Sequence, residues 1–249
     1  MKRMLTVKEW GNIFEEAQKL GVGFVLLAGG EPMTRRDVLR EAGEYKGILF
    51  PVFTNGTLFD KDYAKLFGIH KNLIPILSVE GGEGRTDDRR GGGIYRRVQR
   101  TMELLQNSRI LFGASVTVTK ENLEEVTGEN FLKELRTRGC KGIIYVEYVP
   151  VDRKSASLAL EERDRQYMNS RIQRLRNGQD EKLYISFPGD EKSSGGCLAA
   201  GRGFFHINAA GNAEPCPFSP FSDTSLLDMS LEDALHSPLF RKLQTSGLL

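Results

Sequence analysis

The sequence predicts an α/β fold built from parallel strand–helix units, and three observations lead to this class. Five short apolar runs alternate with segments whose apolar residues have helical spacing. Each apolar run ends in small or polar residues, a pattern typical of parallel βαβ units. The chain has 249 residues, 39% of them hydrophobic, which is enough for one large domain or for a domain with a smaller module. Both an open doubly wound sheet and a partial barrel fit this pattern.

The first 28 residues predict a helix followed by a strand. Apolar residues recur at helical spacing over residues 6–20, and Gly21 ends the helix. Thr6 is the expected N-cap, with Glu9 completing a capping box. Residues 24–28 form an apolar run that predicts a strand buried on both faces. Because the chain opens with a helix, the array lacks its first strand, and the strand at residues 24–28 is expected to have an exposed edge.

The alternation continues through the next hundred residues. Further strands are expected over residues 47–53, 73–79, 111–118 and 142–149, and further helices over residues 34–42, 60–67, 94–106 and 122–138. The segment from residue 151 to residue 190 is highly charged, and we expect it to be a linker with a solvated helix over residues 160–177.

The C-terminal part has a different composition and predicts a separate module over residues 191–249. It is rich in Gly, Asn, Pro and Ser and contains two of the three cysteines. Residues 204–208 alternate as a strand does, and residues 209–212 predict a hairpin turn. A helix is expected over residues 230–243.

The three cysteines argue against a disulfide framework, which needs an even and denser set. Cys140 stands just before an apolar strand and is expected to be a small buried residue. Cys197 and Cys216 would be brought together by the hairpin, as the ligands of thiolate metal sites are. Two cysteines do not complete a four-ligand site, and His206 is either a third ligand or a packed histidine.

Charge and hydropathy exclude several classes of function. The net charge of +2 gives no global attraction to nucleic acid or membranes. No stretch approaches the about 20 apolar residues of a membrane helix, and no apolar signal core follows Met1. We therefore expect a cytoplasmic location. Arginines gather over residues 85–100 and 163–176, either as solvated mixed-charge faces or as contacts for an acidic peptide or nucleic acid, although aromatic platforms for bases are lacking.

Polar residues collect at four of the predicted strand ends. In parallel α/β folds the carboxyl ends of the strands share one rim, where ligands bind. Gly29 and Gly30, which follow the first of these strands, would let a ligand approach the backbone, although a bare Gly-Gly pair also fits an ordinary turn. Together these ends suit a zwitterionic or ribose-bearing small molecule. The residues concerned are Gly29, Gly30, Glu31, Pro32, Thr54, Asn55, Ser78, Glu80 and Ser115.

The order of these motifs resembles the radical S-adenosylmethionine (SAM) superfamily, in particular members with a SPASM or Twitch auxiliary-cluster module. The resemblance rests on Gly-Gly-Glu-Pro at residues 29–32, Thr-Asn-Gly at 54–56, Ser-Val-Glu-Gly at 78–81, and the cysteine hairpin. It covers nearly the whole chain. It implies a partial (β/α)6 barrel over residues 1–150 and an incomplete auxiliary-cluster module over residues 191–249.

The resemblance also implies ligands, partners and a reaction. Gly29, Gly30 and Glu31 would hold the methionyl amino group of SAM, and the other strand-end residues would lie near SAM or the substrate. Cys197 and Cys216 match ligands of an auxiliary iron–sulfur cluster. In the family a catalytic [4Fe–4S] cluster, reduced by a donor such as flavodoxin or ferredoxin, cleaves SAM. The resulting radical abstracts a hydrogen from a peptide or small-molecule substrate.

Two features of the family are not found in this sequence. No cysteine precedes Gly21, so the Cys-x3-Cys-x2-Cys loop that holds the catalytic cluster is missing, and further auxiliary cysteines do not follow Cys216. We therefore expect a truncated radical SAM chain that is inactive alone. Two alternatives stay open: a non-catalytic peptide-binding protein that keeps the barrel fold, and an α/β enzyme with a structural zinc at Cys197 and Cys216.

Overall fold

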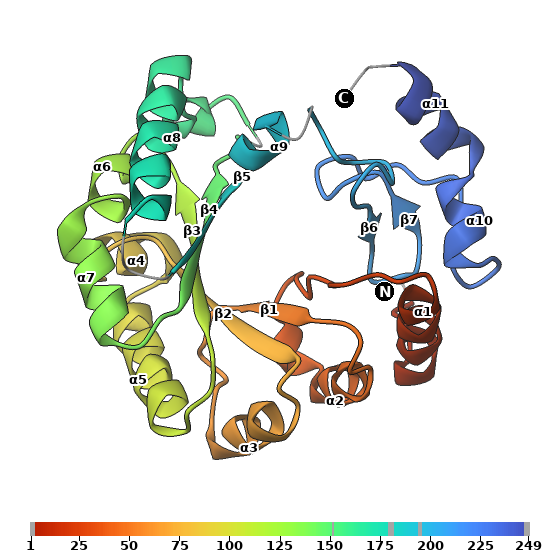
Figure 1. Cartoon of the computed structure of the whole chain (residues 1–249), viewed down its shortest axis with the longest axis horizontal. Coiled ribbons are helices and arrows are strands. Elements are labelled where there is room, and N and C mark those ends of the chain that lie inside the picture. Colours follow the sequence, from red (N-terminus) through yellow and green to blue (C-terminus); the bar gives the residue numbers. More distant parts are fainter. Residues whose placement is uncertain (1–2, 151, 179–181, 194–195, 247–249) are drawn as a thin grey trace. The chain divides into compact units, whose positions relative to one another are not determined.

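The computed structural model forms two compact units, and Figure 1 shows the whole chain. The first unit combines the N-terminal helix with the C-terminal residues. The sequence had instead predicted separate domains over residues 1–150 and 191–249. The structure describes residues 3–150, 152–178, 182–193 and 196–246. The first unit comprises residues 1–25, 37–48 and 191–249, and the second comprises residues 26–36 and 49–190.

The second unit contains a five-stranded parallel sheet in the order β1-β2-β3-β4-β5, which confirms the α/β prediction. Consecutive strands are neighbours, as expected when each is joined to the next by a crossover helix. In Figure 1 the helices α3, α5, α7 and α8 lie along the outer face of this sheet. The strands are β1 (Phe50–Thr54), β2 (Leu73–Val79), β3 (Gly113–Val118), β4 (Gly142–Glu147) and β5 (Leu183–Phe187).

The two faces of the sheet differ in burial. Val79, Val116 and Tyr145 are register partners on β2, β3 and β4, and all three are fully buried. The Tyr145 hydroxyl donates to the carbonyl oxygen of Val126 at 3.0 Å, so this face packs against the helices. The opposite face carries Ser78 and Ser115, which are also register partners. This second face is the one available to a ligand inside a partial barrel.

The segment at residues 24–28 lies beside β1, but it is not buried on both faces as predicted. Leu27 forms a parallel bridge with Val52, donating its N–H to the carbonyl of Pro51 at 2.9 Å. Phe24 and Leu26 are 57% and 53% exposed. The apolar residues of this segment therefore belong to an edge segment and not to a central strand. Its position at the edge of the sheet agrees with the expected exposed edge.

The helices of the second unit agree with the expected positions, with three differences. The helix expected at residues 122–138 is broken at Gly128, where a Cβ would lie 2.9 Å from the carbonyl oxygen of Glu124. The helix expected from residue 34 begins as a short 3-10 turn, η1. Helix α4 was not predicted. The elements are η1 (Pro32–Thr34), α3 (Lys61–Ile69), α4 (Glu83–Arg90), α5 (Ile94–Asn107), α6 (Leu123–Val126), α7 (Glu129–Thr137), η2 (Ser155–Leu158) and α8 (Glu162–Arg176).

The charged segment expected to be a linker over residues 151–190 instead contributes α8 and β5 to the second unit. Met168 and Ile172 of α8 are buried. Its arginines hold the helix on the sheet: Arg165 pairs with Glu147 at 2.6 Å, and Arg176 pairs with Asp190 at 2.6 Å. The high charge density indicated a solvated helix because the long-range partners of these arginines are not apparent in the sequence.

The first unit packs α1, α2, a short hairpin and two C-terminal helices together. The capping box of Thr6 and Glu9 begins α1 as predicted. The helix expected over residues 230–243 is two helices, because Pro238 begins the second of them. No helix in the described residues is both long and apolar enough to cross a membrane. The elements are α1 (Val7–Lys19), α2 (Arg36–Glu44), α9 (Gly189–Ser193), β6 (His206–Ile207), β7 (Ala213–Glu214), α10 (Leu231–Leu235) and α11 (Pro238–Ser246), where α2 and α9 begin at the end of the second unit's segments.

Candidate functional site at the strand ends

Glu31 joins two of the predicted motifs at the rim of the second unit. One carboxylate oxygen, Oε1, accepts the backbone N–H of Met33 at 3.0 Å and the hydroxyl of Thr54 at 2.8 Å. The other, Oε2, accepts the backbone N–H of Asn55 at 2.9 Å. The structure therefore brings Glu31, Thr54 and Asn55 together, as the sequence predicted for these strand ends. Pro32 follows as the first residue of η1, where its missing N–H costs nothing.

Gly29 and Gly30 leave open space beside this carboxylate. Gly29 has a φ of +124°, a conformation that other residues rarely adopt, and no heavy atom lies within 4 Å of a Cβ built at either position. Both residues are exposed. A ligand can therefore reach the backbone here without meeting a side chain.

Ser78 and Ser115 are neighbours on the half-buried face of the sheet. They are register partners on β2 and β3, and both precede the strand ends by one to three residues. Ser115 is 9% exposed and Ser78 is half-buried. Their hydroxyls can therefore serve as donors or acceptors to a ligand held against this face.

Two arginines donate hydrogen bonds to the carboxylate of Glu80. Its carboxylate is 2% exposed, and it accepts hydrogen bonds from Arg89 Nη1 at 3.2 Å and from Arg90 Nε at 2.8 Å. Burial raises the pKa of Glu80, and the two guanidinium groups act against this rise. The sequence placed Glu80 at the correct strand end but did not indicate these partners.

Asn122 is a rim residue that the sequence analysis did not select. Its side-chain amide donates to the carbonyl of Glu80 at 3.0 Å and to that of Thr117 at 2.9 Å, and its oxygen accepts the N–H of Thr119 at 2.8 Å. Asn122 thus ties the ends of β2 and β3 together. An Asn three residues after Thr119, the residue that follows β3, was the available signal, because such a residue can hydrogen-bond nearby backbone.

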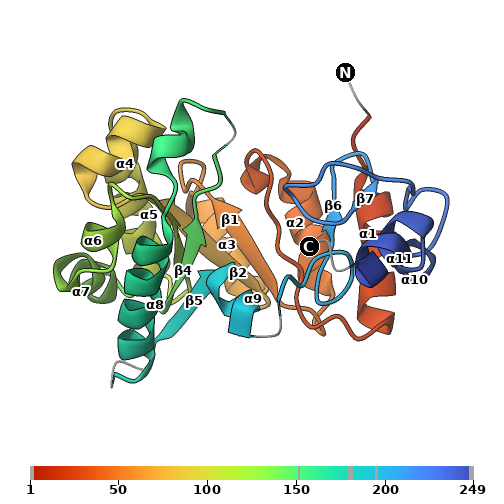
Figure 2. The same ribbon diagram turned by 90° about the horizontal axis from the view of Figure 1, so that it is seen from above.

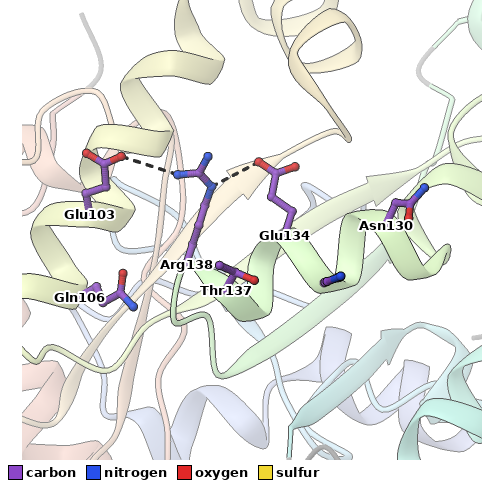
Figure 3. A pocket seen from close by; sticks show the side chains of 7 residues that line it. Glu103, Gln106, Asn130, Glu134, Thr137 and Arg138 are labelled. Carbon is purple, nitrogen blue, oxygen red and sulfur yellow. Dashed lines mark hydrogen bonds and ion pairs between the residues drawn. The ribbon is translucent and has the colours of Figure 1, made fainter.

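A groove of about 570 Å³ lies away from the strand ends, between α5 and α7 (Figure 3). Glu103 and Gln106 line it from α5, and Asn130 and Glu134 from α7. Arg138 pairs with Glu134 at 3.2 Å and lies 3.7 Å from Glu103. Its lining residues belong to α5, to α7 and to the residue after α7, on the outer helices, so this groove does not belong to the strand-end site.

The cysteine hairpin lies in the first unit. The N–H of Ala200 donates to the carbonyl of Pro215 at 3.0 Å, which aligns the segments carrying Cys197 and Cys216. His206 Nδ1 lies 2.8 Å from Glu214 Oε2, so it is a paired histidine of the hairpin. Within the described residues, no three His, Cys, Asp or Glu side chains are placed to hold a metal ion. The described residues therefore do not fit a four-ligand metal or cluster site.

The three thiols are expected to differ in reactivity. Cys140 is 1% exposed, and burial raises the pKa of its thiol to about 11. Cys197 and Cys216 are partly exposed. Because the thiolate is the reactive species, a disulfide reagent at pH 8 should modify two thiols in the folded chain and a third only in urea. Rapid modification of three thiols without denaturant would contradict this burial.

Comparison with known proteins identifies the family. Residues 1–128, half of the chain, match the profile of the Radical SAM superfamily, and the chain belongs to this superfamily. Members use SAM and a [4Fe–4S] cluster.

Three known proteins illustrate the similarity. The chain is 26% identical to the AdoMet-dependent heme synthase of Methanosarcina barkeri, over 96% of this chain and 76% of that protein. It is 29% identical to the PqqA peptide cyclase of Rhizobium meliloti, over 50% of this chain and 34% of that protein. The structure of SuiB from Streptococcus suis bound to S-adenosylmethionine superposes with a TM-score of 0.79 at 17% identity, covering 97% of this chain and 61% of SuiB. The chain thus spans about three fifths of SuiB, and this likeness confirms the partial-barrel fold.

Proposed function

We propose that this chain supplies the SAM-binding and substrate-binding surface of a radical SAM enzyme of the SPASM or Twitch kind. The observation that carries the proposal is the hydrogen-bonded junction of Glu31 with Thr54 and Asn55 beside the open backbone of Gly29 and Gly30. In an enzyme of this superfamily, SAM supplies a 5′-deoxyadenosyl radical that abstracts a hydrogen atom from the substrate.

Glu31 suits the ammonium group of the SAM methionyl moiety. A carboxylate has about four acceptor positions, and three are taken by Met33, Thr54 and Asn55. The fourth belongs to Oε2, which has a single donor. A charge-assisted hydrogen bond from a ligand ammonium to this oxygen would complete the set. The open backbone of Gly29 and Gly30 gives the ligand access, and Ser78 and Ser115 offer hydroxyls on the same sheet.

The residues of this chain do not fit the catalytic [4Fe–4S] cluster. No cysteine precedes Cys140, and Cys140 is buried next to β4 with its thiol donating to the carbonyl of Gly142 at 3.2 Å. Cys197 and Cys216 lack the further ligands that a cluster requires among the described residues. We keep this pair as candidate metal ligands, to be tested by iron and zinc analysis after anaerobic reconstitution of the chain and of a Cys197→Ser variant.

A peptide or another small molecule is the proposed substrate. SuiB is known in complex with its precursor peptide SuiA, and this complex superposes on the chain with a TM-score of 0.76. The PqqA peptide cyclase also acts on a peptide, as its name states. The heme synthase, which matches over most of its length, favours a small molecule as the second candidate. A non-catalytic peptide-binding protein would bind neither SAM nor its demethylated analogue.

A substitution at Gly30 tests the site without disturbing the fold. We expect Gly30→Ala to weaken SAM binding at least about fivefold, because the added methyl group would occupy the space where the ligand meets the backbone. Stability should be unchanged or rise by about 0.4–1 kcal/mol. The readouts are calorimetric SAM titration and urea unfolding.

Gly68→Ala is the matched control for this substitution. Gly68 lies in α3, away from the strand ends, and a Cβ there meets nothing within 4 Å. This variant should bind SAM as the wild type does. Equal SAM affinity in the Gly30 and Gly68 variants would contradict the proposed position of the ligand.

A further inference from the structure

Glu80 holds two arginines of one helix at the rim of the second unit. Arg89 and Arg90 are the last residues of α4, and both donate to the 2%-exposed carboxylate at the end of β2. Arg90 uses two nitrogens, Nε and Nη2, whereas Arg89 uses Nη1 alone. A buried carboxylate with two cations fixes their positions more firmly than an exposed pair would.

The cluster carries one positive charge more than its carboxylate neutralises. Within the described residues, no ion pair joins an acidic residue of α4 to Arg89 or Arg90. Glu83 pairs with Arg96 at 2.9 Å, and the carboxylate of Asp87 accepts the backbone N–H groups of Gly93 and Tyr95, both at 2.7 Å. Asp88 is exposed to water. The three charged groups in mutual contact, Glu80, Arg89 and Arg90, therefore sum to about +1 beside the strand ends, where a ligand would lie.

Arg89 extends from the end of β2 to the end of β4. Its guanidinium carbon lies 5.5 Å from the ring centroid of Tyr148, which follows β4 and donates its backbone N–H to Val118 at 3.0 Å. Figure 2 shows α4 and the segment after β4 at the same end of the sheet. Contact with an aromatic ring restrains the plane of a guanidinium group and leaves its edge free for hydrogen bonds.

One edge of the Arg89 guanidinium group is not used by the contacts with Glu80 and Tyr148. Among the residues that the structure describes, Nε and Nη2 of Arg89 have no hydrogen-bond acceptor, and the side chain is 40% exposed. These two nitrogens form the edge of a guanidinium group that binds a carboxylate through two parallel hydrogen bonds. A phosphate monoester carries about −2 and would exceed the single available positive charge, so a carboxylate is the better match.

We propose that Arg89, positioned by Glu80 and Tyr148, binds a carboxylate group of the substrate. That the ligand is a substrate rests on the proposed function, whereas the carboxylate site itself rests on the geometry of Arg89. The substrate class is accordingly a carboxylate-bearing molecule, either a peptide with an acidic side chain or C-terminus or a small organic acid. Arg89 is a specificity-determining residue in this account, and Glu80 and Tyr148 are positioning residues.

The test uses the full chain labelled with ¹⁵N-arginine and sodium acetate as the probe, at constant ionic strength maintained with chloride. The Nε–H signals of Arg89 and Arg96 are assigned from Arg89→Lys and Arg96→Lys variants. Arg96 is the control because it is exposed, follows α4 closely and is paired with Glu83. We expect the Nε–H signal of Arg89 to shift saturably with acetate. The shift of the Arg96 signal should be less than about one tenth of the shift of the Arg89 signal. No shift at Arg89, or equal linear shifts at both arginines, would overturn the proposal.

A second titration distinguishes a substrate carboxylate from the methionyl carboxylate of SAM. With SAM present at saturation, as measured separately by calorimetry, acetate should still shift the Arg89 signal. Loss of the acetate response on SAM binding would assign the site to SAM and overturn the substrate proposal. If SAM does not bind while acetate shifts Arg89, the carboxylate site stands and the proposed function fails, so the two failures are distinguishable.

Discussion

Replacing Glu31 with glutamine is expected to reduce SAM affinity by at least about thirtyfold and to lower the free energy of unfolding by about 1–3 kcal/mol. The carboxylate accepts three hydrogen bonds, two on Oε1 and one on Oε2. A glutamine amide can accept at only one of these atoms, so its NH2 group must face at least one donor. The loss of charge also removes the partner of the SAM ammonium group. Calorimetric titration with SAM and urea unfolding followed by circular dichroism measure the two effects.

Glu124→Gln is the matched control for this substitution. Glu124 is an exposed residue in the first turn of α6, and its neutralisation should alter neither SAM affinity nor the urea midpoint by more than experimental error. SAM binding by the Glu31 variant at wild-type affinity would show that this carboxylate is a structural cap only. The strand-end site would then need another acceptor for the ligand.

Replacing Phe240 with alanine is expected to lower the free energy of unfolding of the first unit by about 3–5 kcal/mol. The ring is fully buried in the cluster with Ala200, Ala213 and Ala234. It also contacts Phe205 edge-on, with ring centroids 5.8 Å apart. The small neighbours cannot fill the space of a phenyl ring, so a cavity would remain. Urea unfolding followed by fluorescence of Trp10, the chain's single tryptophan and a residue of this same unit, measures the loss.

Lys242→Ala controls for substitution in α11, because Lys242 is exposed on the same helix. It should unfold with the wild-type midpoint. Phe240→Leu should lose less than half as much stability as the alanine variant, since most of the buried volume is kept. An alanine variant as stable as the wild type would contradict the existence of a packed core around the hairpin.

Local sequence patterns predicted the elements whose bounds are set by residues close to one another in the sequence. The strand expected at residues 73–79 is observed with the same bounds, because its apolar run ends directly at the polar rim. The start of α1 was also predicted to the residue, since Thr6 and Glu9 interact within one turn. The strand-end residues could be selected because parallel strands place their carboxyl ends on a common rim.

Long-range interactions account for what the sequence did not predict. Helix α4 has few apolar residues, and its arginines are fixed by Glu80, ten residues before Arg90. Strand β5 follows a charged helix that is held on the sheet by Arg165 and Glu147, and these residues are eighteen positions apart. The partners of Glu31 lie more than twenty residues away, at Thr54 and Asn55. Such pairings depend on the tertiary fold, so neither periodicity nor residue spacing indicates them.

Calorimetric titration of SAM into the full wild-type chain tests the central claim most directly. We expect saturable binding with one site per chain and a Kd between about 10 µM and 1 mM, equivalent to about −7 to −4 kcal/mol. The affinity should fall in the Gly30→Ala variant and be retained in Gly68→Ala. The absence of binding heat at SAM concentrations up to several times the upper Kd would contradict a SAM site at Gly29, Gly30 and Glu31.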